Sequence, residues 1–265
     1  MRKPTDKCLL CLSNDSKKKN SHIFPKFLSI NLLGPKQSRK GFQITSDKSI
    51  LNHKIPVQDS PKDDYILCPE CEKYLGVLET VSSSFFNNWR SNMENSSYNF
   101  ETYTKDFSLL QYNNPNRKSL KLLIYSIFWR ASISDSALFN NIKIDKDFET
   151  KLRKLILSFK TTKHQELSQL LKEKPQFEVF PFTIITADSF INVTANILHV
   201  PVYNSGYGLI IDQYAFLLFR DQSDVPEELF KWGGNLKMDD CKMLVFSTEY
   251  WYNTIIKPAL YLFYT

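Results

Sequence analysis

The sequence has few glycines, few cysteines and no long apolar run. It holds 7 Gly and 5 Cys among 265 residues. No apolar run reaches the roughly 18 residues that a membrane-spanning helix needs. The first residues also lack the charged and apolar regions of a secretory signal peptide. We therefore expect a cytoplasmic protein without a membrane partner, in which the cysteines stay reduced rather than forming a disulfide scaffold.

The composition is that of a folded protein. Hydrophobic residues make up 42% of the chain and aromatic residues 14%, which is enough for extensive cores and excludes global disorder. A chain of 265 residues is long enough for one large domain or two modest ones.

The net charge of +6 is unevenly distributed along the chain. Residues 1–60 contain 12 Lys and Arg against 4 Asp and Glu, a balance of +8, whereas residues 61–79 contain 2 against 5, a balance of −3. A basic surface beside a small acidic patch suits a protein that meets phosphates and also holds a cation. The alternative is that lysine is simply abundant here, as are Asn and Ile in products of AT-rich genomes.

Hydrophobic spacing predicts four helices. The first runs from about Glu70 to Trp89, and the others occupy residues 119–132, 146–159 and 164–173. The second is apolar on every side, so we expect it to be buried. Asp145 or Asp147 is in place to cap the third.

The pattern changes after Pro175 to short apolar segments rich in β-branched and aromatic residues, which predict strands. Helices followed by strands indicate an α+β domain. The aromatic stretch at residues 251–265 is expected to be a buried strand or helix. We predict an N-terminal module at residues 1–95, a linker at 96–118 that is dense in Asn, Ser and Tyr, and an α+β domain at 119–265.

Four of the five cysteines form two closely spaced pairs, Cys8-x-x-Cys11 and Cys68-x-x-Cys71. Two such pairs are the usual way to build a tetrahedral four-sulfur zinc site, and four protein sulfurs leave no coordination position for water. We therefore predict a structural zinc ion. Cys241 stands alone and is predicted to be a small buried side chain.

A histidine and several carboxylates lie close to these cysteine pairs in the sequence. Hydrolysis of a phosphodiester needs a base that deprotonates water and a hard cation that stabilises the leaving oxygen. His22 is a candidate base, because its unperturbed pKa lies near neutrality. Glu72 and Glu79 are seven residues apart and share one face of the first predicted helix, so they are candidate ligands for Mg²⁺ or Mn²⁺. Glu70 lies on another face.

The order of these motifs resembles that of a known family. A Cys-x-x-Cys pair, then S-H-I-F-P at residues 21–25, then L-C-P-E-C-E-K-Y-L-G-x-x-E at residues 67–79 is similar to the zinc-stapled HNH nucleases of the ββα-metal class. The resemblance implies that His22 is the general base and that Glu72 and Glu79 help to hold the catalytic metal. It also implies the fold class: α+β, with a small zinc-stapled ββα-metal, treble-clef-like N-terminal module followed by an α+β domain. The sequence departs from the family at Ser21, where many members have Asp or Glu, and at Glu72, where His or Asn is usual.

Basic residues flank the candidate base. On the functional interpretation they contact the phosphate backbone of a nucleic acid without reading its sequence; on the structural one they form a solvated loop. The six residues are Lys17, Lys18, Lys19, Lys26, Arg39 and Lys40. His53 is expected to be a loop residue, and Arg130, inside an apolar helix, is expected to pair with a buried carboxylate or carbonyl.

The sequence thus favours a metal-dependent endonuclease that acts on DNA, or less readily on RNA. The resemblance also suggests an effector of a bacterial defence system. The alternative function is a catalytically degenerate zinc module that binds nucleic acid or protein. The C-terminal domain would regulate the module, either by binding a protein partner or by binding a small molecule.

Overall fold

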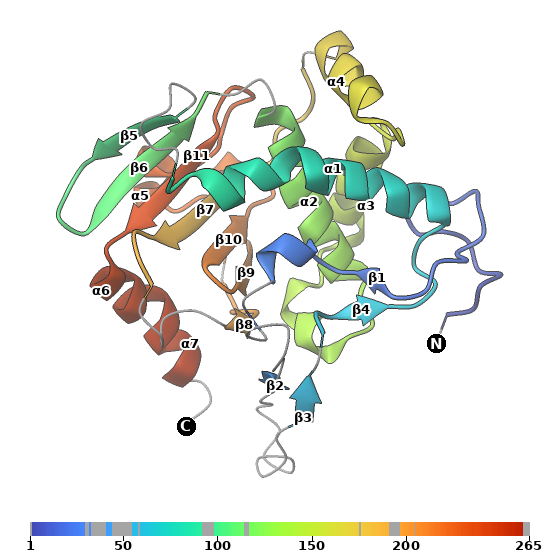
Figure 1. The fold of residues 1–265 in the computed structure, drawn as a ribbon, viewed down its shortest axis with the longest axis horizontal. Helices are drawn as coiled ribbons and strands as arrows, with labels where there is room; N and C mark the ends of the chain where they lie inside the picture. The colour runs from blue at the N-terminus through green and yellow to red at the C-terminus, as the bar shows by residue number, and fades with distance from the viewer. Residues whose placement is uncertain are drawn as a thin grey trace.

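The computed structural model describes residues 2–29, 32, 41–43, 55–57, 59–91, 98–113, 117–174, 176–190, 197–203 and 205–261. Over these residues the protein is α+β, as predicted, with helices packed around a seven-stranded mixed sheet (Figure 1). Three segments, η1 (Lys26–Leu28), η2 (Ala137–Ile142) and η3 (Gln222–Asp224), are short 3-10 helices.

The large sheet has the strand order β5-β6-β11-β7-β10-β9-β8. Neighbouring strands run antiparallel except β11 and β7, which are parallel. Five of the seven strands follow Pro175, where the sequence predicts strands. The bounds are β5 (Tyr98–Thr102), β6 (Phe107–Tyr112), β7 (Phe182–Ala187), β8 (Leu198–His199), β9 (Tyr207–Ile211), β10 (Tyr214–Leu218) and β11 (Lys242–Phe246).

Strands β5 and β6 lie within residues 96–118, which the sequence predicts as a linker, so this segment belongs in part to the sheet. Strand β5 is at the edge, and four of its five residues are exposed. An exposed edge strand places little demand on apolar residues, so its polar composition resembles that of a linker.

The four predicted helices are present with nearly the expected bounds. They are α1 (Pro69–Asn88), α2 (Arg117–Ile133), α3 (Lys146–Leu157) and α4 (His164–Glu173). Every residue of α2 from Ser119 to Ser132 is buried, as its apolar surface predicts. Asp145 caps α3, because its carboxylate accepts a hydrogen bond of 3.0 Å from the backbone N–H of Phe148.

The last segments that the structure describes, up to residue 261, are helical. After α5 (Glu227–Trp232), the segments α6 (Thr248–Trp251), a π-helical turn η4 (Tyr252–Ile256) and α7 (Lys257–Tyr261) follow one another directly. Trp251 is fully buried, so the described part of the aromatic stretch, residues 251–261, is helical and packs on the protein. Among the described helices, none has the length and apolar character needed to cross a membrane.

The N-terminal part contains a short pair of antiparallel strands followed by a helix. The two strands are about 40 residues apart in the sequence, and the pair is called the β1–β4 hairpin below. Strand β1 (Ser21–His22) pairs antiparallel with β4 (Lys62–Asp63), and α1 begins six residues after β4. Strands β2 (Gly41–Gln43) and β3 (Ile55–Val57) form a separate pair between β1 and β4 in the sequence. Figure 1 shows β1 and β4 beside the N-terminal half of α1, on the opposite side of the molecule from β5.

The buried side chains divide between the two faces of the sheet. Ile184 of β7 belongs to a large cluster on the face toward α1 and α2, and this cluster extends to Cys8 and Phe24. The next residue, Ile185, belongs to a second cluster with Trp251. One continuous core therefore joins the N-terminal module to the helices and the sheet; the predicted domain limits themselves stay a prediction.

Candidate metal centre and histidine site

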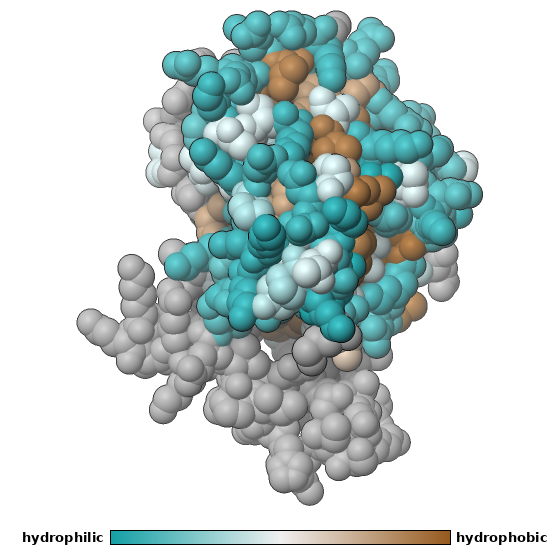
Figure 2. Space-filling view, turned by 90° about the vertical axis from the view of Figure 1, so that its right-hand side faces the viewer, coloured by the Kyte–Doolittle hydropathy of each residue, from teal (hydrophilic) through white to brown (hydrophobic). Residues whose placement is uncertain are grey.

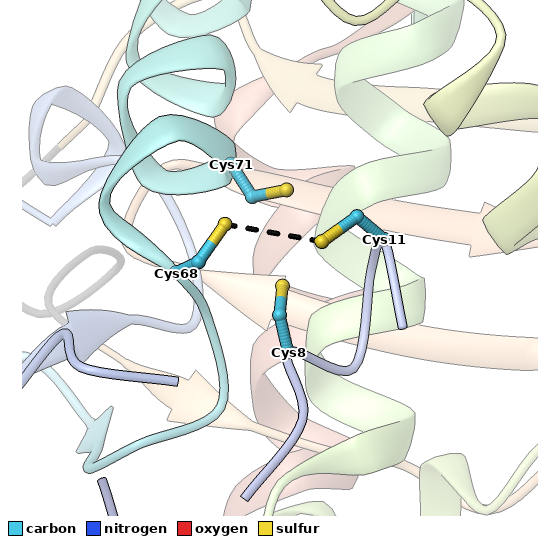
Figure 3. Close-up of side chains that lie close together, drawn as sticks. All are labelled: Cys8, Cys11, Cys68 and Cys71. Carbon is cyan, nitrogen blue, oxygen red and sulfur yellow. Dashed lines mark hydrogen bonds between the residues drawn. The ribbon is translucent and has the colours of Figure 1, made fainter. Parts of the chain in front are cut away.

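The four predicted cysteine ligands converge on one point. Cys8 and Cys11 lie in an N-terminal turn, Cys68 caps α1, and Cys71 lies in its first turn (Figure 3). Their sulfur atoms all lie within 4.8 Å of one another, and the Sγ atoms of Cys11 and Cys68 are 3.9 Å apart. Four sulfurs bound tetrahedrally at about 2.3 Å would lie about 3.8 Å apart. The group therefore fits a structural metal ion such as zinc.

Backbone hydrogen bonds shape the turn that carries Cys8 and Cys11. The N–H of Leu12 donates to the Cys8 carbonyl at 2.8 Å, and the N–H of Cys8 donates to the Asn14 carbonyl at 2.8 Å. Leu12 has a φ of 58°, in the left-handed region that favours glycine. The N–H of Leu9 donates to the Ile66 carbonyl at 2.9 Å, which holds the first cysteine pair against the segment that leads into the second.

The cysteine thiols share their protons unequally. Hydrogen bonding to the Cys71 thiol lowers the pKa of Cys8 to about 4, and the same contact raises the pKa of Cys71. A bound metal needs thiolates, so ion binding would release the remaining protons.

The metal centre is fastened to the helices behind it. Arg153 of α3 donates to the Leu10 carbonyl at 3.2 Å, and the Tyr74 hydroxyl of α1 donates to the Ile156 carbonyl at 2.8 Å. Lys160, beyond the end of α3, forms an ion pair of 3.1 Å with Glu70. These contacts fix the position of the cysteine pairs relative to α1 and α3.

The candidate base His22 is half-buried at the end of β1. Its Nδ1 lies 2.8 Å from the Ser60 hydroxyl. Burial lowers the pKa of His22, and the positive charge of Lys62, its cross-strand neighbour, lowers it further; the negative charge of Asp59 opposes them. The imidazole is therefore neutral at pH 7, and one of its nitrogens can accept a proton.

Of the two predicted acidic residues, Glu79 is connected by Arg130 of α2 to the backbone of His22. Arg130 is 2% exposed. Its Nη1 donates to the Glu79 carboxylate and to the His22 carbonyl, both at 2.9 Å. Arg130 thus pairs with both a carboxylate and a carbonyl, which confirms the interpretation of the sequence.

Glu72 lies about two helical turns before Glu79 in α1 and next to Ser21. Burial raises the pKa of Glu72, while the Ser21 hydroxyl, Arg130 and Lys18 lower it. The Ser21 Oγ is itself fully buried and makes no well-formed hydrogen bond within the described segments. His22, Glu72 and Glu79 do not form a second metal-ligand group of the kind formed by the cysteines, as far as the described residues extend. Their roles in catalysis stay predictions.

The predicted phosphate-binding lysines lie at the surface around this site. Lys17, Lys19 and Lys26 are exposed and Lys18 is half-buried. The backbone of Lys18 bonds to Leu67 and Tyr65, which holds the lysine run against the segment preceding α1. The molecular face that carries the N-terminal segment is mainly hydrophilic (Figure 2). Arg39, Lys40 and His53 lie outside the described residues.

Sequence reasoning missed three residues beside the candidate base: Asp59, Ser60 and Lys62. Ser60 contacts the imidazole, and Asp59 forms an ion pair with Lys62. Their only sequence signal is their position just before the second cysteine pair. The antiparallel register that pairs His22 with Lys62 places them at the site, and that register joins segments about 40 residues apart.

Comparisons of the chain with protein-family models, with curated proteins and with solved structures found no match. The resemblance to HNH nucleases therefore has no support from a family match and rests on the motifs alone.

Proposed function

We propose that the protein is a metal-dependent endonuclease that hydrolyses phosphodiester bonds of DNA, with RNA as the less favoured substrate. The observation that carries the proposal is the position of His22. It lies on a short hairpin beside α1, the helix that carries Glu72 and Glu79, and the four-cysteine group holds the start of that helix. This hairpin-then-helix order supports a zinc-stapled, treble-clef-like ββα-metal module.

Each residue has a role in the proposed reaction. Cys8, Cys11, Cys68 and Cys71 hold a structural zinc ion. Neutral His22 takes the proton from the attacking water. Glu72 and Glu79 hold Mg²⁺ or Mn²⁺, which when bound supplies positive charge at the leaving oxygen. The six basic residues, including Arg39 and Lys40, contact phosphates without reading sequence.

Cleavage of supercoiled plasmid tests the proposal. The wild-type protein is incubated with Mg²⁺ or Mn²⁺ beside a His22→Ala variant, and the zinc content of both is measured. A matched control is His164→Ala, which removes an exposed histidine at the start of α4. We expect wild type and the control to nick the plasmid and His22→Ala to lose at least 100-fold in rate, the lower range of general-base contributions. Equal cutting by His22→Ala, or no cutting by wild type with either metal, would reject the proposal.

The second candidate is a non-catalytic module that binds nucleic acid. One observation favours it: the Glu79 carboxylate is already paired with the buried Arg130 guanidinium. The positive charge of Arg130 offsets the negative charge of the Glu79 carboxylate, so the pair attracts a further cation less strongly than a free carboxylate would. The binding function predicts that DNA affinity falls steeply with salt and is the same in His22→Ala, with no cleavage in either protein.

Three further proposals rest on the sequence alone. They are action in the cytoplasm, a role in bacterial defence, and control by a protein partner through the C-terminal domain.

A further inference from the structure

Ser60 and Asp59 form a short chain of polar contacts behind His22. Ser60 is 8% exposed, and its Oγ lies 2.8 Å from Nδ1 of His22. The backbone N–H and the hydroxyl of Ser60 both face Oδ1 of Asp59, at 2.8 and 3.4 Å. The other carboxylate oxygen of Asp59 forms an ion pair with Lys62.

From these contacts we infer that Ser60 and Asp59 are positioning residues for His22. They fix the imidazole proton on Nδ1 and leave Nε2 as the unprotonated nitrogen. The inference deepens the proposed function, because it names the atom that would accept the proton from water. The tautomer itself can be measured whether or not the protein cuts DNA.

The positions of the protons in the contacts between His22, Ser60 and Asp59 support this assignment. A serine hydroxyl has a single proton to donate, while its oxygen can also accept. An ionised carboxylate only accepts. Burial raises the pKa of Asp59, but the contacts with Lys62 and with the Ser60 N–H together outweigh it and lower the pKa below its ordinary value. The Ser60 proton therefore points to Asp59, so its oxygen accepts from an N–H at Nδ1. In neutral imidazole Nε2 then carries no proton.

The backbone of His22 is fixed from the other side. Arg130 donates to the His22 carbonyl at 2.9 Å and is itself held by Glu79. The ring is thus oriented at Nδ1 by a side chain of the hairpin, and its strand is held by a side chain of α2. A hydrogen bond at one ring nitrogen that sets the state of the other is the usual way to orient a histidine for catalysis.

Nitrogen NMR of the full chain labelled with ¹⁵N-histidine tests the tautomer. The chain has only 4 histidines, and the signal of His22 is identified by its loss in His22→Ala. At pH 8 we expect wild-type His22 to carry its proton on Nδ1. Ser60→Ala and Asp59→Asn should shift the tautomer toward Nε2–H, whereas Ser158→Ala, which removes an exposed hydroxyl at the end of α3, should leave it unchanged.

A second set of variants keeps the test decisive if Ser60→Ala does not fold. Ser60→Thr retains the hydroxyl and should retain the Nδ1–H tautomer, and Asp59 is exposed, so Asp59→Asn leaves the core intact. A wild-type His22 with its proton on Nε2, or an unchanged tautomer in both Ser60→Ala and Asp59→Asn, would overturn the inference.

Kinetics separate this inference from the proposed function. If wild type nicks plasmid, we expect Ser60→Ala to lower kcat by about 10- to 100-fold with KM unchanged, by analogy with partners that orient metal-ligating histidines. If the tautomer behaves as expected but no variant nicks plasmid, the proposed function fails and the positioning chain stands. If wild type nicks plasmid but its tautomer does not depend on Ser60 or Asp59, the inference fails alone.

Discussion

Strands β7 and β10 are buried over every residue, whereas β1 and β4 have two residues each and none of β4 is buried. The central strands are stabilised by apolar area removed from water on both faces of the sheet. The β1–β4 hairpin has little such area of its own. The two cysteine pairs lie on either side of it in the sequence and meet at the start of α1. A metal ion bound there would hold it in place, as in small domains that depend on a bound metal.

The comparison predicts that the two regions are sensitive to different kinds of mutation. In the sheet region, a change that adds apolar contact should stabilise the protein. Near the hairpin, the metal ligands and the backbone geometry of the cysteine turns should matter more than apolar contact.

The largest effect is expected at the four-cysteine group, where a substitution would remove the proposed zinc ion. Cys71→Ser removes one ligand, and a structural zinc site contributes about 10–16 kcal/mol of apparent binding energy in small zinc-finger peptides. We expect hydrogen exchange to rise sharply in residues 8–24 and 60–72 and to rise far less in β7 and β10. Hydrogen-exchange mass spectrometry measures this difference.

The matched control for that experiment is Cys241→Ser, which changes a cysteine that is 1% exposed and lies next to β11. It should keep the metal and leave exchange in the hairpin as in wild type. Equal increases of exchange in both regions of Cys71→Ser would show that the hairpin and the sheet unfold together, which contradicts the comparison.

A smaller effect is expected at Lys121, which is fully buried in α2. Its ammonium donates to the Asp240 carbonyl and lies 5.1 Å from the centre of the Phe182 ring. Burial lowers the pKa of Lys121 from 10.5 to about 8. Lys121→Met removes this buried charge and should stabilise the protein by about 2 kcal/mol at pH 7, because one pKa unit corresponds to about 1.4 kcal/mol and the lost hydrogen bond costs about 1.

The pH dependence of that effect has a defined sign. Between pH 8 and pH 10.5 the unfolded chain keeps the Lys121 proton while the folded protein has lost it, so wild-type stability should rise with pH across this window. Lys121→Met should lack the rise. Urea denaturation of both proteins at pH 7 and pH 9 measures it, and an equal or larger gain from the substitution at pH 9 would contradict the assignment.

The smallest effect is expected at Leu12, in the turn of the first cysteine pair. Leu12 is 52% exposed and adopts a left-handed conformation. Leu12→Gly removes an apolar side chain but relieves about 1 kcal/mol of backbone strain, so the thermal unfolding temperature of the metal-bound protein should rise slightly. A drop in that temperature would show that the exposed leucine side chain contributes more than the backbone does.

Local signals in the sequence account for much of the fold. Helix α3 was predictable because Asp145 caps a segment with apolar residues at helical spacing, and α2 because its large apolar residues leave no polar face. Strand β5 was not, because it exposes most of its side chains at the edge of the sheet.

The candidate site was predictable only in part. The two Cys-x-x-Cys spacings specify the sulfur group directly, since each pair needs only one tight turn. The contacts of His22 with Ser60 and of Arg130 with Glu79 depend on tertiary structure. They join residues 38 and 51 positions apart, and no local pattern encodes which partners meet.

The most direct test of the account is the metal content of the purified protein. The central claim is that Cys8, Cys11, Cys68 and Cys71 together hold one zinc ion that positions the hairpin carrying His22. Wild type and Cys71→Ser are purified without added metal. The zinc bound per chain is then measured by inductively coupled plasma mass spectrometry. We expect one zinc ion in wild type and almost none in Cys71→Ser. Wild-type protein that folds without zinc, or a variant that keeps as much zinc as wild type, would contradict it.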